Sequence, residues 1–111
     1  MDDCLFCRIV AGEIPATVVH ESEQVLAFQD VNPQAPVHVL VIPKRHVGNI
    51  GELGAHPESA AYVLAGIRAV ADELNLQSYR TVFNTGGDSG QTVFHVHAHV
   101  LSGRSFGWPP G

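Results

Sequence analysis

The sequence predicts an α+β domain in which about five antiparallel strands pack against one long helix. Two observations predict this class. Short β-prone runs alternate with turn residues, and a single long segment repeats apolar residues at helical spacing. No internal repeat, low-complexity tract or linker divides the 111 residues. We therefore expect one compact domain over residues 1–111.

The first third of the chain predicts a short N-terminal helix followed by a hairpin. Residues 4–12 form a helical turn that ends at Gly12, a common stop residue. Two β-prone runs, residues 17–21 and Val25–Gln29, flank the polar segment 22–24. That pattern is typical of two antiparallel strands joined by a turn.

A buried strand is expected after the hairpin. Residues 32–36 form a loop that contains two prolines. Residues 37–42 are apolar apart from His38, so we expect a strand that is buried on both faces. Pro43 ends this strand, because proline cannot donate a hydrogen bond to a sheet.

The rest of the chain predicts one long helix and two more strands. The helix covers residues 57–76, with a proline in its first turn. Its apolar residues follow the spacing of one buried face: Ala60, Val63, Leu64, Ile67, Val70, Ala71 and Leu74. Residues 79–84 and 92–101 are the last strands, separated by the glycine-rich loop 86–90 and followed by an irregular tail.

The composition argues against two classes of binding partner, nucleic acids and membranes. The formal net charge is −5 with only six Lys and Arg, which argues against a nucleic-acid-binding face. No apolar run approaches the roughly 20 residues that a membrane-spanning helix needs, and the N-terminus does not resemble a secretory signal. We therefore expect a cytoplasmic protein that binds neither nucleic acid nor membrane. In a reducing compartment, the pair Cys4 and Cys7 favours metal binding or redox chemistry over a structural disulfide.

Three of the seven histidines alternate along the last predicted strand, as His95, His97 and His99. Because alternate side chains of a strand share a face, we expect the imidazoles on one face and the intervening residues in the core. Two interpretations follow. Either one imidazole is a nucleophile and its neighbours orient it, or the three bind a catalytic metal. The preceding glycine-rich loop has backbone N–H groups that suit a phosphate.

Residues 95–101 resemble the His-φ-His-φ-His-φ-φ signature of the histidine-triad (HIT) superfamily, in which φ is apolar. The similarity covers essentially the whole chain and is to the Hint-like branch. The matching residues outside the signature are Phe6, Ile9, Glu13-Ile14-Pro15, Ala27-Phe28, Asp30, Asn32-Pro33-Gln34-Ala35-Pro36, Val41-Ile42-Pro43-Lys44, His46, Asn84, Gly90-Gln91 and Trp108-Pro109-Pro110-Gly111.

This resemblance implies the HIT-like fold and a homodimer, in which a continuous ten-stranded sheet takes five strands from each subunit. It also implies hydrolysis of purine nucleoside phosphoramidates, in which adenosine or guanosine monophosphate is linked to an amine. The middle histidine attacks phosphorus, a nucleotidyl-histidine intermediate forms, and water releases the nucleoside monophosphate. No cofactor takes part in this catalysis.

The resemblance assigns catalytic roles to the triad and to one hydroxyl. His97 is the nucleophile, with His95 as the first member of the triad. His99 contacts the phosphate and helps to handle the leaving-group proton. Thr92 lies near the leaving group, where its hydroxyl can relay a proton. No catalytic role is assigned to the other histidines. His38 is expected to hydrogen-bond within the sheet.

The resemblance also assigns the nucleotide-binding residues. Asn84 and the backbone around Gly90, Gln91 and Val93 hold the phosphate oxygens. Asp30 binds the ribose hydroxyls, although from the residues alone it reads as a turn residue. The base pocket is apolar and consists of Leu5, Phe6, Ile9, Ile14, Phe28 and Val31. Trp108, in the tail, is expected at the dimer interface and the neighbouring active site.

Cys4 and Cys7 are absent from many animal Hint proteins, but bacterial relatives and related uridylyltransferases often carry such a pair. There the pair resembles a structural zinc site completed by two histidines, which by position are His46 and His95. Two thiolates and two imidazoles are the closed tetrahedral set that structural zinc prefers. Two buried thiols or a labile disulfide are the alternatives.

Three other functions remain open. The first is hydrolysis of dinucleoside polyphosphates, the second is nucleotide or partner binding with weak catalysis, and the third is metal-dependent hydrolysis with the triad as ligands. The Hint-like tail argues against dinucleoside polyphosphate hydrolysis. The third needs ligands from upstream, because the twelve residues after His99 contain no His, Cys, Asp or Glu.

Overall fold

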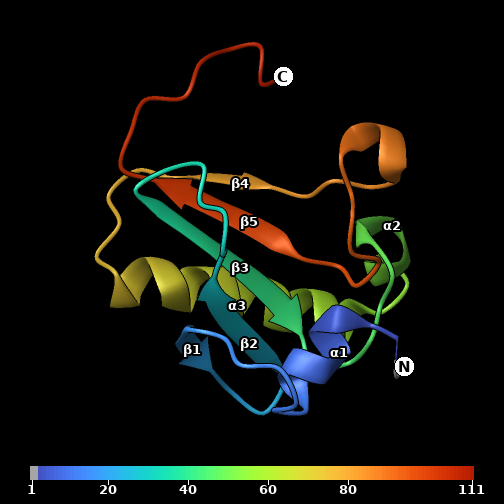
Figure 1. Cartoon of the computed structure of the whole chain (residues 1–111). Helices are drawn as coiled ribbons and strands as arrows, with labels where there is room; N and C mark the ends of the chain where they lie inside the picture. The colour runs from blue at the N-terminus through green and yellow to red at the C-terminus, as the bar shows by residue number, and fades with distance from the viewer. Residues whose placement is uncertain (1–2) are drawn as a thin grey trace.

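The computed structural model describes residues 3–111 and confirms the α+β class (Figure 1). Five strands form one antiparallel sheet in the order β1 (Val18–Glu21), β2 (Val25–Gln29), β3 (Val37–Pro43), β5 (Ala98–Ser102) and β4 (Arg80–Val82). The helices are α1 (Leu5–Val10), α2 (Ile50–Leu53) and α3 (Pro57–Glu73), with a short 3₁₀ turn, η1 (Gly87–Ser89). Among the described residues, no helix is long and apolar enough to cross a membrane.

The central strand β3 is buried on both faces, as predicted, because a helix covers each side of the sheet. On one face, α3 packs over Val39, Val41 and the core residues around them. On the other face, Phe6 of α1 packs with Leu40 and Ile42. Two apolar clusters therefore sandwich the sheet, and His38 shares a face with Leu40 because alternate strand residues point the same way.

The predicted start of the last strand is wrong. β5 begins at Ala98 rather than at residue 92, because its pairing with β3 ends at Val41 and Ala98. The preceding residues bond to the loop after β3 instead: the Val96 N–H donates to the Val47 carbonyl at 2.6 Å. The first two histidines of the triad thus lie before the strand and only His99 lies within it.

Two smaller differences concern helices. α3 ends at Glu73, three residues before its predicted end, and Asn75 takes a left-handed φ of 54° that an α-helix cannot continue. α2 was not predicted. Asn49 caps it by accepting the Glu52 N–H at 2.9 Å, but a helix of four residues is too short to show a period.

Candidate active site

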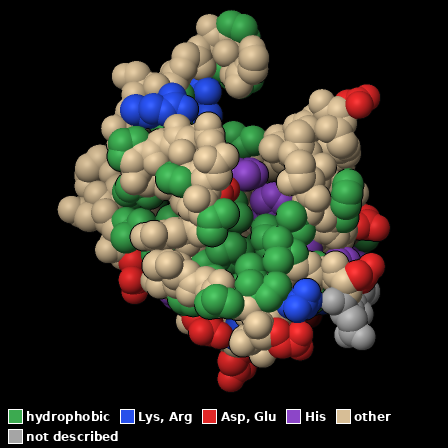
Figure 2. Space-filling view, in the orientation of Figure 1, with side chains coloured by type: hydrophobic (Ala, Val, Ile, Leu, Met, Phe, Trp, Pro, Cys, Tyr) green, Lys and Arg blue, Asp and Glu red, His purple; other side chains and the backbone are tan. Residues whose placement is uncertain are grey.

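The side chains of the triad region lie as the alternation predicts, although most of the segment is not a strand. Val96, Ala98 and Val100 join the core under α3. His97 lies on the α1 side, with its ring centroid 5.0 Å from that of His99 and 5.1 Å from that of Phe6. Figure 2 shows histidine side chains in a hollow bordered by hydrophobic side chains. The site is therefore partly open to solvent.

A backbone carbonyl fixes the protonation of His97. Its Nδ1 lies 2.8 Å from the carbonyl oxygen of His95, which can only accept, so Nδ1 carries the proton. The other ring nitrogen, Nε2, then has a free lone pair. Phe6 packs edge-on against the ring with an interplanar angle of 86°, which restricts its rotation. His97 is thus held in one orientation, with Nε2 as the nitrogen available to act as a nucleophile.

A second chain of hydrogen bonds fixes His99 through His38, which forms the expected hydrogen bond within the sheet. The Gln34 backbone N–H donates to His38 Nδ1 at 3.0 Å, so the proton of His38 is on Nε2. That N–H donates to His99 Nδ1 at 2.9 Å. The proton of His99 is therefore on Nε2, where it serves as a hydrogen-bond donor. A lone histidine in an otherwise apolar strand was the signal for this partner, because a buried polar group needs one.

Burial keeps these imidazoles neutral. Desolvation, together with smaller effects of the neighbouring His97 and His38, lowers the pKa of His99 to about 4, against an opposing effect of Asp30. Desolvation also lowers the pKa of His38, while Asp30 raises it. The tautomers described above therefore persist at neutral pH.

These shifts predict an acid-sensitive fold. Between the unfolded pKa of 6.5 and the folded pKa of about 4, His99 binds a proton only in the unfolded state, so stability falls as pH decreases through that window. At the acid end of this pH window, the contribution of His99 lowers the free energy of unfolding by about 3 kcal/mol, at 1.36 kcal/mol per unit of pKa difference. Urea unfolding of wild type and His99→Asn between pH 7.5 and 4.5 measures it. The variant should show a shallower pH dependence than wild type and His20→Asn, and parallel curves would contradict the assignment.

Asp30 is a turn residue that also faces His38 and a cavity. Its Oδ1 accepts the Asn32 N–H at 2.8 Å, as in a turn, while Oδ2 lies 3.4 Å from His38 Nε2. A cavity of about 330 Å³ is lined by Asp30 and by three of the predicted base-pocket residues: Ile9, Phe28 and Val31. Phe6 is buried against Phe28 and joins this wall to the histidines.

Two predicted base-pocket residues are not among those that line this cavity. Leu5 is 43% exposed and lines a different cavity beside Cys4, because it precedes Phe6 on α1 and points away from it. Ile14 is half-buried and is not among the residues that line the Asp30 cavity. Trp108 is 84% exposed. It lies in the tail that follows β5 and extends past the edge strand β4 (Figure 1).

Hydrogen bonds of the Gln91 side chain stabilise the predicted phosphate loop. This buried side chain accepts the Gly86 N–H at 3.0 Å and donates to the Gly48 and Val93 carbonyls. Gly90 has a φ of +95°, which favours glycine, and Asn84 lies against it. Thr92 follows and is exposed, whereas Val93 is half-buried. The loop therefore holds the predicted phosphate contacts Asn84, Gly90 and Gln91 close together.

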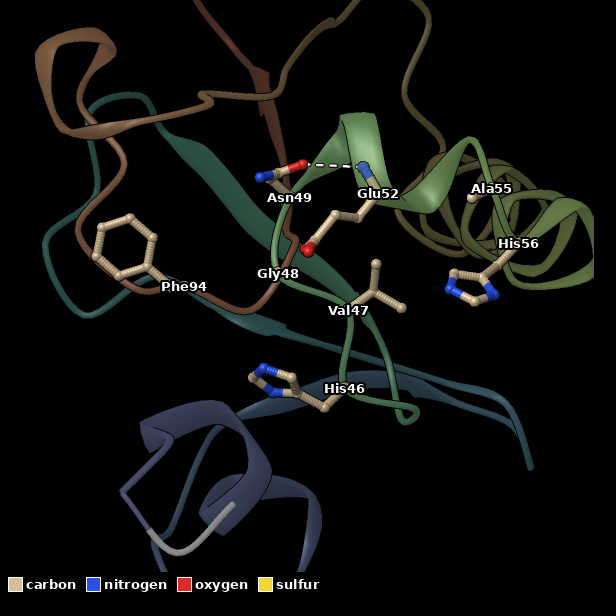
Figure 3. Close-up of a pocket in the computed structure, with 8 residues that line it drawn as sticks. All are labelled: His46, Val47, Gly48, Asn49, Glu52, Ala55, His56 and Phe94. Carbon is tan, nitrogen blue, oxygen red and sulfur yellow. Dashed lines mark hydrogen bonds between the residues drawn. The ribbon is translucent and has the colours of Figure 1, made fainter.

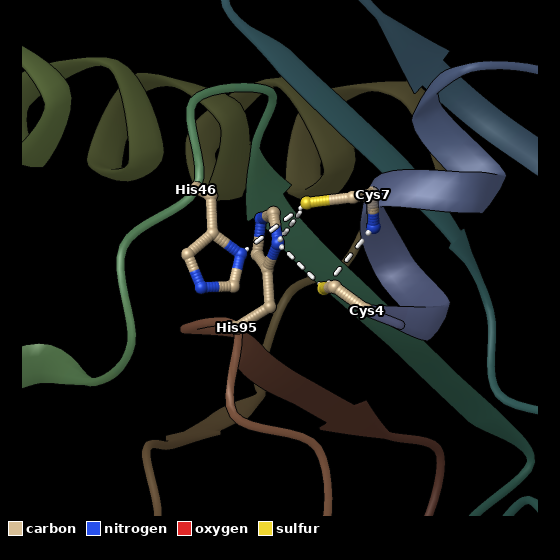
Figure 4. Close-up of side chains that lie close together, drawn as sticks. All are labelled: Cys4, Cys7, His46 and His95. Carbon is tan, nitrogen blue, oxygen red and sulfur yellow. Dashed lines mark hydrogen bonds between the residues drawn. The ribbon is translucent and has the colours of Figure 1, made fainter. Parts of the chain in front are cut away.

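The predicted metal ligands Cys4, Cys7, His46 and His95 form a compact cluster (Figure 4). Their ligand atoms all lie within 4.8 Å of one another. His95 Nδ1 is 3.5 Å from each sulfur, and Cys7 Sγ is 3.3 Å from His46 Nδ1. Segments far apart in the sequence thus meet here: α1, the loop after β3 and the segment before β5.

The donor set of this cluster fits a metal cation. His95 Nε2–H donates to the Pro43 carbonyl at 2.7 Å, so the lone pair on Nδ1 faces the two sulfurs. Desolvation lowers the pKa of His95 to about 4, which keeps that lone pair free. Burial and the neighbouring Cys4 raise the pKa of Cys7 to about 11, so a cation is needed to stabilise its thiolate.

A second group of potential ligands, Asp30, His38 and His99, also lies within 4.8 Å. Here the hydrogen bonds oppose a metal. Coordination through His38 Nε2 requires its proton to move to Nδ1, where it would face the Gln34 N–H at 3.0 Å. The hydrogen bonds around His38 therefore oppose a metal held by Asp30, His38 and His99.

A model of the HIT domain matches residues 11–106. This chain belongs to the HIT-domain family. An uncharacterized HIT-like protein of Synechococcus elongatus is 49% identical over 99% of this chain and 98% of its own length. A 14 kDa zinc-binding protein of Zea mays is 47% identical over 96% of this chain and 87% of its own. A HIT family hydrolase of Legionella pneumophila has a TM-score of 0.91 at 46% identity, covering 98% and 100% of the two chains. The HIT domain described here is thus similar to hydrolases of its family.

Proposed function

We propose that this HIT domain hydrolyses purine nucleoside phosphoramidates through a covalent nucleotidyl-His97 intermediate. The observation that carries the proposal is the orientation of His97, whose Nδ1–H is held by the His95 carbonyl at 2.8 Å while Nε2 is free. The nucleotide lies with its base against Phe28 and its ribose hydroxyls at Asp30, in the adjoining cavity. The loop at Gly90 binds the phosphate.

The reaction proceeds in two displacements at phosphorus. His97 Nε2 forms a bond to phosphorus as the P–N bond breaks. His99 Nε2–H donates a hydrogen bond to a phosphoryl oxygen and stabilises the charge that develops there. Water then attacks nucleotidyl-His97, which releases the nucleoside monophosphate and restores the imidazole.

The proton of the leaving amine comes by another route. His99 is neutral at pH 7 and cannot give up its only N–H proton, because desolvation lowers its pKa to about 4. Thr92 is exposed beside the phosphate loop, so its hydroxyl can relay a proton from water to the amine. This assignment moves the leaving-group proton from His99 to Thr92.

The test compares substrates and looks for the intermediate. Purified protein is given an adenosine phosphoramidate or diadenosine tetraphosphate, and release of adenosine monophosphate is followed. We expect faster release from the phosphoramidate, and a mass increase of one nucleotidyl group on His97 after rapid acid quenching. Faster cleavage of the tetraphosphate would favour the polyphosphate hydrolase. Tight nucleotide binding with negligible turnover of either would favour the binding module.

His38 is expected to act as a positioning residue. In His38→Ala, the His99 Nδ1 loses its donor, so the Nε2–H that faces the phosphoryl group is no longer specified. We expect kcat to fall about 10² to 10³-fold with a smaller change in KM. Steady-state kinetics at several pH values measures this, with His20→Ala as the control. An unchanged kcat in His38→Ala would remove the relay from the mechanism.

We also propose that Cys4, Cys7, His46 and His95 hold a structural zinc ion. The donor set, the lone pair of His95 and the name of the Zea mays relative support this. Bound zinc supplies a cross-link between three segments of the chain and takes no part in the two displacements.

We further propose a homodimer that places the exposed Trp108 of each tail at the neighbouring active site. The support is its 84% exposure in a tail that leaves its own sheet. Sedimentation analysis of wild type and of a chain truncated before the tail tests the assembly. A monomeric wild type at micromolar concentration would contradict it.

A further inference from the structure

Cys4 and Cys7 form a pair of thiols that can undergo redox chemistry, which phosphoramidate hydrolysis does not use. Both cysteines are only half-buried, and the backbone N–H of Cys7 donates to Cys4 Sγ at 3.3 Å. Both sulfurs lie 3.5 Å from His95 Nδ1. The sulfurs are thus close to each other as well as to the imidazoles, within 4.8 Å.

The cluster is open to small solutes from two sides. A cavity of about 580 Å³ is lined by Cys4, His46 and Thr92, among others. A second of about 510 Å³ lies between His46, Glu52 and the 60%-exposed Phe94 (Figure 3). A structural metal sealed in a core has no such access, and a peroxide molecule is small enough to enter either cavity.

The backbone already suits a disulfide between the two cysteines. Cys4 caps α1 and Cys7 lies in its first turn. Helical geometry places residues three apart at Cα positions about 5 Å apart, within the range that a disulfide accepts. Rotation of the two side chains therefore brings the sulfurs into bonding distance without unfolding α1.

The cluster is also connected to the nucleophile. Phe6, between the two cysteines on α1, packs its ring 5.1 Å from that of His97 and 6.0 Å from that of His95. The carbonyl of His95 orients His97. Loss of the metal cross-link therefore loosens the helix that forms one wall of the active site.

We propose that Cys4 and Cys7 form a reversible, peroxide-sensitive clasp, in which oxidation to a disulfide expels the metal and slows the enzyme. The proposal rests on the zinc site proposed above. One thiolate attacks a peroxide oxygen, the O–O bond breaks, and a sulfenic acid and hydroxide form. The second thiolate attacks the sulfenic sulfur, which forms the S–S bond and releases a second hydroxide. Both thiolates are oxidised and the peroxide is reduced, the two hydroxides take two protons from the buffer to form water, and a dithiol reverses the reaction.

The test uses the full chain, reconstituted with zinc and then titrated with hydrogen peroxide. Released zinc is followed with a chromophoric chelator, free thiols are counted, and intact mass is recorded. We expect zinc release in step with the loss of two thiols, and a mass lower by two hydrogen atoms. Hydrogen exchange of the α1 amides should accelerate at least about 10-fold, and phosphoramidate turnover should fall. Dithiothreitol with zinc should restore the starting values.

The control is Cys4→Ser/Cys7→Ser, checked for its fold by circular dichroism. Peroxide should leave its fractional activity and α1 exchange unchanged. A wild type that holds zinc but keeps both the metal and its thiols would overturn the clasp and leave the zinc site standing. Oxidation to sulfinic acid, or a disulfide with the metal retained, would also overturn the clasp. A chain that binds no zinc after reconstitution would overturn both.

Discussion

Replacing His97 with Ala is expected to reduce kcat for an adenosine phosphoramidate by at least about 10⁴-fold. No other described group offers an imidazole nitrogen with a free lone pair in the same position. The His99 Nε2 carries a proton, and the His95 Nδ1 faces the cysteines. Single-turnover measurement of adenosine monophosphate release gives the effect.

Nucleotide binding separates this loss from misfolding. The base and ribose contacts at Phe28 and Asp30 lie outside the substitution, so calorimetry should show adenosine monophosphate binding within about 10-fold of wild type. His20→Ala, on β1, should keep wild-type turnover. Substantial turnover by folded His97→Ala, without a covalent intermediate, would rule out nucleophilic catalysis by this residue.

The second large effect concerns stability. Removing the metal by chelation, or by Cys7→Ser, is expected to lower the free energy of unfolding by about 4 kcal/mol or more. The reason is that the cluster ties α1 to the loop after β3 and to the segment before β5. Thermal unfolding of zinc-loaded and chelated protein measures the change.

Non-additivity tells whether the metal causes that loss. Chelation should lower the melting temperature of wild type but not of Cys7→Ser, because the two changes remove the same interaction. An equal further loss in the variant would mean that chelation acts elsewhere. Equal stability of loaded and chelated wild type would mean that the metal is not structural.

The sequence predicted the elements whose patterns are long or regular. The hairpin of β1 and β2, the buried strand β3 and the helix α3 each carry a period of apolar residues or clear turn signals. The predicted start of β5 was wrong because alternation alone does not show where pairing with the neighbouring strand stops. Residues 92–97 alternate as a strand does, yet the pairing of β5 with β3 stops at Ala98, although β3 itself continues to Pro43.

The sequence predicted most residues of the candidate site, but it did not predict which hydrogen bonds connect them. The four proposed metal ligands and the histidines were identified by resemblance, and the structure brings them together. A hydrogen bond of His38 within the sheet was predicted, but its partner was not, because the contact reaches 61 residues along the chain to His99. The tautomers also depend on backbone atoms of Gln34, His95 and Pro43, whose positions no side-chain pattern encodes.

Strand β3 also sets the distance between the two histidines whose protons it fixes. Near one end it carries His38, which sets the proton of His99, and at the other end the Pro43 carbonyl sets the proton of His95. A paired strand can neither stretch nor slide by a fraction of a residue, so the spacing between these two imidazoles is fixed by main-chain geometry. The cavity beside Asp30, the proposed nucleotide pocket, can therefore be altered for another base while both proton positions stay as they are.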